Sequence, residues 1–470
     1  MARTTAPSLP GLRRAAALAF AAASVLAPTP PAAAEGLVEA WHAALRADPD
    51  LAVSRAARAA GAARGNQAAT LWQPQVSVSA LGGIGRSESA IDGARFGAPG
   101  FGTAEGASFR TSVDGGSGRI ALQARQPLWS GELTARGRQL GLAGEAAEHA
   151  WRAAGQTAML RVATQWLEVS LAMRALEVAT RQQAAVDRAL AEATDRWRIG
   201  DAPVVGTHEA RARAEAVRAQ AIAARAELAL REAAFADLTG RPVGTLRPGA
   251  VSAAPEDPAP GTLQHWLDAA ADGNADVRAL DVAVRVARAE ADVHARGAQA
   301  SVDLVASASR ERIGGSGDFG PASSAATQGL VGVQISVPLW TGGQREARRE
   351  EALRLAERAD AELDRARRRV ALEVRAAWLG LETGAQRIAA LEQSRIASAA
   401  RLQTTRTGLE VGDRTTLDVL NAENDSAQAE LALAQARIAR LIDGLRLAAL
   451  AGTLDEAGLA RVDARLGAQR

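Results

Sequence analysis

The pattern of apolar and polar positions is most regular in two long segments, residues 132–197 and 343–409. Apolar side chains there recur at steps of seven, four and three residues, a spacing typical of the buried stripe of a coiled-coil helix. In the second segment this stripe includes Leu363, Val370, Val374, Trp378 and Leu381. At about 1.5 Å per residue, each segment predicts a helix roughly 100 Å long.

Each predicted long helix ends at a glycine that is followed by aspartate. The two glycines are Gly200 and Gly412. Glycine is common where a helix stops, and aspartate and threonine are common where the next helix begins. A second helix returns after each turn, so the sequence predicts two long helical hairpins, at residues 132–240 and 343–452.

Apolar and polar residues alternate over four shorter segments, most strictly at residues 331–337. A period of two residues predicts β-strands. The expected strands lie near residues 75–85, 119–128, 301–311 and 328–338. The glycine-rich segments between them, residues 82–118 and 314–320, are expected to form loops.

Strands of about ten residues have the length of strands in membrane β-barrels. Four strands cannot close a barrel, and open sheet edges are not tolerated in lipid. Several chains would therefore have to share one barrel. The predicted fold class is mainly α with a membrane β-barrel, in which long antiparallel coiled-coil helices continue from the strands.

The same order of elements occurs twice. The sequence QPLWSG at residues 126–131 returns as VPLWTG at residues 337–342, and other matching segments keep nearly the same separation. Such internal repetition indicates a duplicated unit. The predicted organisation is a first repeat, a Pro/Gly-rich linker, a second repeat and a C-terminal tail, at residues 35–240, 241–261, 262–455 and 456–470.

Proline and tryptophan mark the point where each strand pair meets a long helix. Pro127 and Pro338 are expected to end the strands and to set the bend before the helix. Trp129 and Trp340 follow directly. These tryptophans have two interpretations: aromatic side chains at a membrane interface, or core anchors where strand meets helix.

The first 34 residues are typical of a secretory signal peptide. Arg3, Arg13 and Arg14 precede an apolar stretch, and three alanines precede Glu35. Small residues at this place are typical of a signal-peptidase site. Cleavage is expected near Ala34 and Glu35, so that the mature chain is exported.

The high isoelectric point, about 10.3, does not indicate a basic protein. The formal net charge of the whole chain is only +2, and it becomes about −1 without the predicted signal peptide, which carries three arginines and no acid. Nucleic acid is therefore not an expected partner. The chain has no cysteine, which excludes disulfides, thiolate metal sites and a lipid-bearing N-terminal cysteine.

An enzyme is not indicated. The five histidines are scattered, none stands in an HExxH arrangement, and the glycines near residue 82 form neither a phosphate loop nor a dinucleotide fingerprint. Acidic residues are spread along the predicted helix faces, so no paired-carboxylate site stands out. We assign no catalytic residue and expect no cofactor and no bound metal.

The residues resemble the TolC family of outer-membrane efflux and secretion proteins. The resemblance rests on the duplicated plan, the two Pro-Leu-Trp junctions, the segment EGLVEA at residues 35–40 and, above all, VGDRTTLDVLNA at residues 411–422. It implies a homotrimer with a shared twelve-stranded barrel in outer-membrane lipid and a tunnel of helices through the periplasm. The implied partners are a periplasmic adaptor and an inner-membrane ABC transporter.

Within the family, the overall pattern is similar to the branch that serves type I protein secretion. The implied substrate is an exported protein toxin of the adenylate cyclase or haemolysin kind. Two alternatives stay open: an efflux channel for drugs or other small molecules, and, from another class, a periplasmic coiled-coil scaffold that conducts nothing. The scaffold would explain the helices but not the matched strands.

The resemblance also implies an entrance gate at the second hairpin. Arg414 occupies the position of the arginine that ties the closed entrance together, and Asp418 that of an acid facing the pore axis, where three copies would attract cations. Without the family, Arg414 and Asp418 are four residues apart on one helix and would form an ordinary exposed pair.

Three positions depart from the family pattern. Asn421 replaces a second acid, Leu409 replaces a tyrosine of the gate, and Gly206 stands where an aspartate is expected to pair with the arginine. Asp201 is a candidate substitute for that aspartate, with solvated turn residue as the alternative. The gate is therefore expected to be looser or differently connected.

Overall fold

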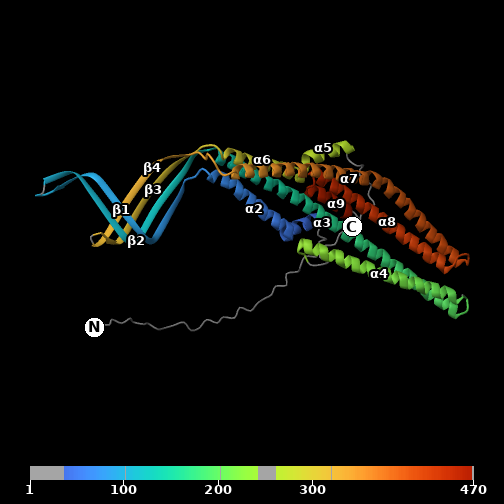
Figure 1. Cartoon of the computed structure of the whole chain (residues 1–470). Coiled ribbons are helices and arrows are strands. Elements are labelled where there is room, and N and C mark those ends of the chain that lie inside the picture. Colours follow the sequence, from blue (N-terminus) through green and yellow to red (C-terminus); the bar gives the residue numbers. More distant parts are fainter. Residues whose placement is uncertain (1–35, 101, 202, 242–260, 319, 468–470) are drawn as a thin grey trace, which may run out of the picture.

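The computed structural model describes residues 36–100, 102–201, 203–241, 261–318 and 320–467. Helices form most of the chain, and four strands form a single sheet at one end (Figure 1). The predicted signal peptide with its cleavage site lies outside the described residues, as does nearly all of the predicted linker at residues 241–261.

The same series of elements occurs twice: two helices, two strands and two long helices. The first series is α1 (Leu37–Ala47), α2 (Pro49–Thr70), β1 (Gln75–Ala98), β2 (Gly102–Ser130), α3 (Gly131–Arg198) and α4 (Val204–Thr239). The second is α5 (Leu263–Gly273), α6 (Ala275–Arg296), β3 (Ser301–Gly317), β4 (Gly320–Ser336), α7 (Gln344–Glu410) and α8 (Thr416–Leu450). The predicted mainly helical fold with four antiparallel strands is confirmed.

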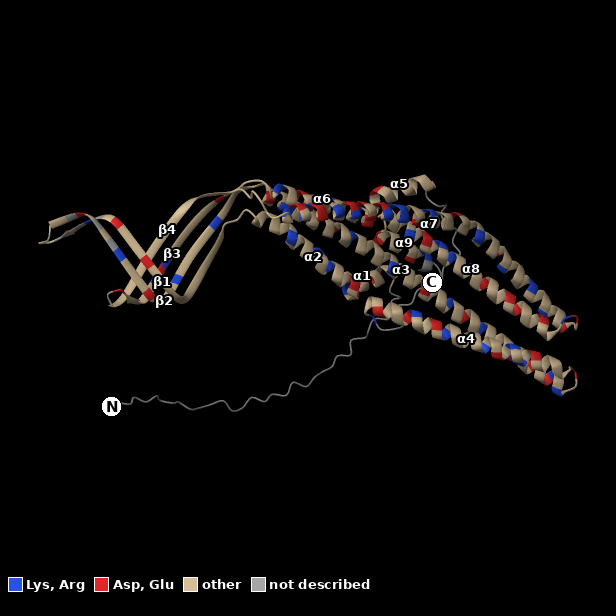
Figure 2. Ribbon diagram, viewed as in Figure 1, with Lys and Arg blue, Asp and Glu red and all other residues tan. Residues whose placement is uncertain are grey.

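The two longest helices, α3 and α7, have 68 and 67 residues. Each extends roughly 100 Å and runs away from the sheet, so that the hairpin tips and the strands lie at opposite ends of the molecule (Figure 1). The helices carry dense charge of both signs, whereas the sheet is mostly uncharged (Figure 2). No helix in the described part of the chain is long and apolar enough to cross a membrane.

The sheet is antiparallel throughout, in the order β1-β2-β3-β4, so β1 and β4 are its edges. β2 pairs with β3 from Ser130 opposite Ser301 to Asp114 opposite Ser316. β1 and β2 continue to pair beyond this point. The first hairpin therefore projects past the second, since β1 and β2 have 24 and 29 residues, whereas β3 and β4 have 17 each.

The glycine-rich segments are strands, so the expected loops at residues 82–118 and 314–320 were wrong, and the strands are longer than predicted. A Cβ atom added at Gly115 would lie 2.2 Å from the carbonyl oxygen of Gly314, and one at Gly315 would lie 2.1 Å from that of Asp114. Glycine is required here because the backbones of β2 and β3 approach closely. When the neighbouring strand is not known, the glycine content of such a segment is typical of a loop.

The expected C-terminal tail at residues 456–470 is also corrected, since it contains helix α9 (Glu456–Gly467). Leu459 is fully buried in a core cluster that includes Leu37 of α1 and Trp166 of α3. Twelve residues give too short a pattern to predict a helix alone. This helix is stabilised by packing rather than by its own sequence.

Two core clusters join the helices at mid-length. In the first, Trp166 of α3 packs against Phe235 of α4, with ring centroids 5.5 Å apart. The second joins α5, α6, α7 and α8 around Val374, which is fully buried. The first cluster also contains Ile438, Leu441 and Leu445 of α8, so it joins the two halves of the chain, whereas the second cluster lies within the second half.

Candidate functional site

The tip of the first hairpin is a tight turn built on Gly200. Its φ of 82° lies in the left-handed region. This conformation ends α3, because Gly200 N donates to Trp197 O and Asp201 N donates to Arg196 O. The carboxylate of Asp201 accepts a hydrogen bond from Arg196 Nε at 2.9 Å. Asp201 therefore forms a local ion pair within its own turn.

The tip of the second hairpin repeats this turn around Gly412, whose φ is 81°. The amides of Asp413 and Arg414 both donate to the carbonyl oxygen of Gly408, at 2.8 and 3.2 Å. The Arg414 side chain lies over Gly408, where an added Cβ would come within 2.6 Å of its Cγ. This glycine thus makes room for the arginine stem at the end of α7.

Asp418 caps helix α8. Its carboxylate accepts hydrogen bonds from the amide and the hydroxyl of Thr415, at 3.0 and 2.8 Å, and its own amide donates to Thr415 Oγ1. This reciprocal arrangement is a capping box. The hydrogen bonds from Thr415 lower the pKa of Asp418, with smaller contributions from the positive charges of Arg414 and Arg401.

The simple ion pair between Arg414 and Asp418 that their spacing suggested is absent among the described residues. Arg414 Nε lies 3.8 Å from the carboxylate of Asp413 instead. The reason is that Asp418 turns back toward Thr415, where it meets two donors. The Thr-x-x-Asp spacing was a signal of this cap that the sequence analysis did not use.

The other predicted gate residues lie at the same two tips. Asn421 is exposed one turn after Asp418, and Leu409 is half-buried near the end of α7. Gly206 is the third residue of α4, and a Cβ added there would meet nothing within 4 Å. The structure of the single chain joins none of these three to Arg414 directly.

Helix α8 connects the two hairpins, which sequence reasoning missed. Leu420 is buried in a cluster with Val186 of α3 and Val217 of α4. Farther from the tip, Glu430 accepts hydrogen bonds from Arg174 and from Arg181, the latter at 2.7 Å. These partners are about 250 residues apart in the chain, so no local spacing could have revealed them.

Helix α8 is also bound to α7 of its own hairpin. Asp425 accepts from Arg401 at 2.6 Å, and Glu423 pairs with Arg406. The tip region thus has charged links on both sides of α8. Such an arrangement can hold the helix in one position or release it when the links break.

The predicted strand-to-helix junctions differ between the halves. β2 continues through Pro127 to Ser130, and a register shift between Pro127 and Trp129 follows. Pro127 therefore does not end its strand, because a bulge absorbs the missing amide donor. Pro338 stands two residues after the end of β4.

The two junction tryptophans are exposed in the single chain. Trp129 is 51% exposed and Trp340 is 86% exposed. Neither side chain is buried against the core of its own chain, as a core anchor within the chain would be. Their position at the helix end of the sheet fits the other interpretation, aromatic side chains at a membrane interface.

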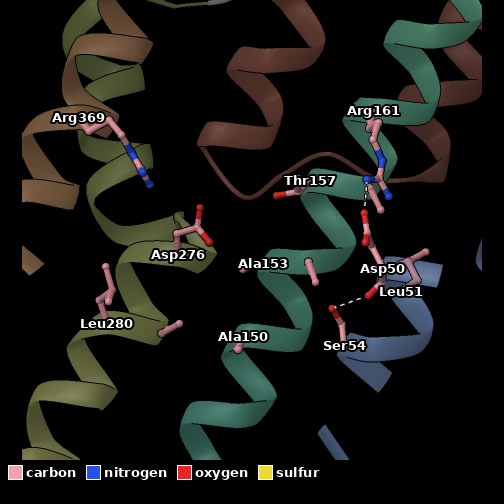
Figure 3. Close-up of a pocket in the computed structure, with 13 residues that line it drawn as sticks. Asp50, Leu51, Ser54, Ala150, Ala153, Thr157, Arg161, Asp276, Leu280 and Arg369 are labelled. Carbon is pink, nitrogen blue, oxygen red and sulfur yellow. Dashed lines mark hydrogen bonds and ion pairs between the residues drawn. The ribbon is translucent and has the colours of Figure 1, made fainter. Parts of the chain in front are cut away.

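A cleft of about 480 Å³ lies at mid-length between α2, α3, α6 and α7 (Figure 3). Small alanines of α3 form one side, Arg161 points toward Asp50, and Asp276 and Arg369 lie on the opposite wall. Arg161 is neutralised by pairs with Asp48 and Asp50. The cleft contains none of the predicted site residues.

The histidines do not gather into a site. His42 contacts Glu456 at 3.2 Å, and His294 contacts Glu290 at 3.4 Å. In the described ranges, no group of three or more histidine, aspartate or glutamate side chains could hold a metal ion. The geometry at the hairpin tips therefore concerns helix ends and charge rather than bond chemistry.

A four-stranded sheet with two open edges, continued by two long helical hairpins, defines the class of outer-membrane channel proteins. The outer membrane efflux protein family matches residues 40–241 and 266–453. The chain belongs to this family. Its members are channels and not enzymes, and the resemblance to the TolC family inferred from the motifs is confirmed.

Individual relatives give the same result. The outer membrane protein TolC of Vibrio cholerae is 25% identical over 433 residues, which cover 92% of this chain and 94% of that protein. The alkaline protease secretion protein AprF of Pseudomonas aeruginosa is 28% identical over 360 residues, 76% of this chain and 74% of that protein.

Among solved structures, the chain is similar to the CmeC outer membrane channel of Campylobacter jejuni. The TM-score is 0.71 at 14% sequence identity, and the match covers 92% of this chain and 89% of that one. At this identity the similarity concerns the fold alone.

Proposed function

We propose that three copies of this chain form one export duct. The observation that carries the proposal is the sheet, whose edge strands β1 and β4 each have one open side among the described residues. Val78 on β1 and Val333 on β4 are largely exposed. Open edges and exposed apolar strands are stable in lipid only when the barrel closes, and three copies would supply twelve strands.

In this proposal the helical hairpins continue the barrel as a tunnel through the periplasm. Their length of roughly 100 Å supports a duct whose tips meet a periplasmic adaptor and an inner-membrane ABC transporter. The signal peptide at residues 1–34 would direct the chain to the outer membrane. The chain would thus receive its substrate at the tips and release it at the sheet end.

We further propose a gate at the tips. Three copies of Asp418 would form an acidic ring, and Arg414 would contact a neighbouring chain, since Asp413 at 3.8 Å leaves it free to reach farther. Asn421, Leu409 and Gly206 would make this gate looser, because each lacks the charge or hydroxyl expected there. Asp201 is a weak substitute for the missing acid because Arg196 already binds it.

The proposed cargo is a protein exported by a type I secretion system. Support comes from AprF, a relative named for protease secretion that aligns with three-quarters of this chain. The family as a whole is named for efflux, so a channel for drugs or other small molecules is the alternative. The non-conducting scaffold is set aside, since the chain belongs to a channel family.

The experiment compares a strain that lacks this chain with its parent and with a complemented strain. Two outputs are measured together: the large proteins of the culture supernatant, and tolerance of dyes, bile salts and antibiotics. Loss of one secreted protein with unchanged tolerance is the expected result. Increased sensitivity with an unchanged supernatant would replace the secretion proposal by the efflux alternative.

A further inference from the structure

The two faces of the sheet differ in exposure on its central strands, β2 and β3. The pairing register places Val78, Leu122 and Ala308 side by side on one face, and the first two are strongly exposed. The opposite face carries Ala121 and Ile313, which are buried although they lie in the same strands. The sheet therefore curls, and we call the exposed side its outer face and the other its inner face.

The apolar part of the outer face has a defined height. On β4 it extends from Ile335 to Thr327, nine residues or about 30 Å of strand. At a tilt of about 40° this corresponds to roughly 23 Å along a barrel axis, close to the apolar band of about 25 Å in membrane barrels. Thr327 thus marks the edge of the band that is distant from the helices.

Two arginines stand on the outer face at and beyond this edge. Arg310 is opposite Ile120 and Thr327, and Arg312 is opposite Gly118 and Ala325. Both are exposed. Because glycine and alanine flank Arg312, nothing on the neighbouring strands covers its side chain.

Arg310 and Arg312 have no acidic partner in the described part of the chain, in contrast to Arg86 and Arg125. Arg86 lies 3.6 Å from Asp114, and Arg125 lies 2.7 Å from Asp303. Glu311 stands between the two arginines in sequence but alternates to the inner face. The pair therefore presents uncompensated positive charge.

Position and charge together define a ligand. An arginine on the lipid side of a barrel is strongly destabilising at the middle of the bilayer and tolerated at its edge. Two guanidinium groups about 7 Å apart along a strand suit phosphate groups, which arginine binds through paired hydrogen bonds. Both arginines lie at the depth of lipid headgroups.

We propose that Arg310 and Arg312 bind the phosphates of a glycolipid in the outer leaflet of the outer membrane. The inference rests on the proposed function for the orientation, since the helices must lie on the periplasmic side. In the proposed trimer, three equivalent sites would surround the barrel. Each site would anchor the outer rim of the barrel in the headgroup layer.

The test measures binding of diphosphoryl lipid A to the purified full chain in detergent by native mass spectrometry. The double variant Arg310→Gln/Arg312→Gln is expected to bind roughly tenfold more weakly. Arg119→Gln, which removes an arginine from the inner face of the neighbouring strand, is the matched control and is expected to bind normally. Lipid A without phosphates is expected to bind all three proteins weakly and equally.

Equal binding of diphosphoryl lipid A by the parent and the double variant would overturn the inference, as would a parent protein that binds the phosphate-free lipid as tightly as diphosphoryl lipid A. Conductance of the same preparations in planar bilayers tests the proposed duct separately from the lipid site. A conducting channel without arginine-dependent lipid binding leaves the duct standing and removes the lipid site. Arginine-dependent binding without conductance supports the lipid site and overturns the duct.

Discussion

At the scale of single residues, the carboxylate of Asp418 has two roles, one within the chain and one in the proposed trimer. Within the chain it caps α8 through Thr415, and those hydrogen bonds lower its pKa. In the proposed trimer it would also supply the charge of an acidic ring. Repulsion among three ionised copies would act in the opposite direction, so the cap helps the ring to stay ionised.

We expect Asp418→Asn and Asp418→Ala to reduce cation preference and block by multivalent cations in planar bilayers. The two variants lose the same charge, but asparagine keeps an acceptor for the cap. If the ring explains selectivity, both variants lose it to the same degree. Asp413→Asn, in the exposed turn before α8, is the control and is expected to keep the selectivity of the parent.

The pH dependence follows from the direction of the pKa shift. Because the pKa of Asp418 is lowered in the folded chain, its capping contribution is complete at neutral pH and is lost only as the pH falls through the lowered value, below about 3.9. Cation preference persists to the same acidic range if the cap outweighs the repulsion among the three carboxylates of the ring. Loss of selectivity already near pH 5 would contradict this assignment.

Gly206 offers a direct test of the gate. A Cβ added there meets nothing within 4 Å, so Gly206→Asp restores the missing carboxylate without a clash. We expect it to lower the resting conductance, whereas Arg414→Ser alone raises it. Gly206→Ala is the steric control.

The double variant Gly206→Asp/Arg414→Ser separates pairing from helix effects. An acid at the third residue of α4 also favours the helix N-terminus by about 0.3–1 kcal/mol, and that effect does not need Arg414. If the gate depends on the pair, the benefit of Gly206→Asp disappears in the double variant. If Gly206→Asp still lowers the resting conductance when Arg414 is changed to Ser, its effect comes from the helix N-terminus alone.

The sequence predicted where the gate residues lie but not what they contact. Arg414 and Asp418 do stand at the second tip, because a Gly-Asp turn is encoded locally. Their partners depend on side-chain direction, and Asp418 prefers the two donors of Thr415 to a single exposed arginine. The links of Glu430 to α3 join distant parts of the chain and leave no local pattern.

At the scale of elements, helix α8 packs between α7, the other arm of its own hairpin, and the first hairpin. Leu420 is 1% exposed in the cluster that α3 and α4 form near their tip. Leu417, one turn earlier on the same helix, is 38% exposed. The two leucines therefore give a matched pair for measuring how much the contact of α8 with the first hairpin contributes to the free energy of unfolding.

Leu420→Ala is expected to lower the free energy of unfolding by about 2–5 kcal/mol, since it leaves a cavity between three helices. Leu417→Ala should change it by less than about 0.5 kcal/mol. Thermal unfolding in detergent, followed by circular dichroism, measures both. Equal effects would mean that the α8 contact with the first hairpin does not hold the tip together.

The helices were predictable and the strands only in part, for a physical reason. A coiled-coil stripe repeats over more than sixty residues in α3 and α7, so local errors average out. The strands contain glycines such as Gly115 and Gly315, which are needed only because another backbone lies against them. Helix α9 depends in the same way on α1, its distant partner.

At the scale of the whole molecule, the chain is incomplete by itself. Within the part of the chain that the structure describes, β1 and β4 are the open edges of the sheet, and a head-to-tail contact between β4 of one copy and β1 of the next would pair both. Such contacts are heterologous and close only if the rotation completes a ring. Because the chain has no cysteine, pairs of introduced cysteines can test this closure by disulfide cross-linking.

We expect Ser79→Cys on β1 to form a disulfide with one of four partners on β4. Ser79 lies on the inner face, and so do Gln328, Leu330, Gly332 and Gln334, each changed to cysteine in turn. Paired antiparallel strands bring facing Cα atoms to about 4.5–5.5 Å, which lies within the Cα separation of disulfides. Only the combination at the correct register should react efficiently.

The expected product on a non-reducing gel is a covalent trimer, with dimers as intermediates, because each copy has one β1 edge and one β4 edge. Ser79→Cys alone should give no trimer, since a single cysteine cannot link three chains in a ring. Cross-linked products larger than the trimer would indicate a larger ring or an open assembly. Failure of all four combinations in outer membranes would mean that the edges are covered in another way, and the shared twelve-stranded barrel would have to be abandoned.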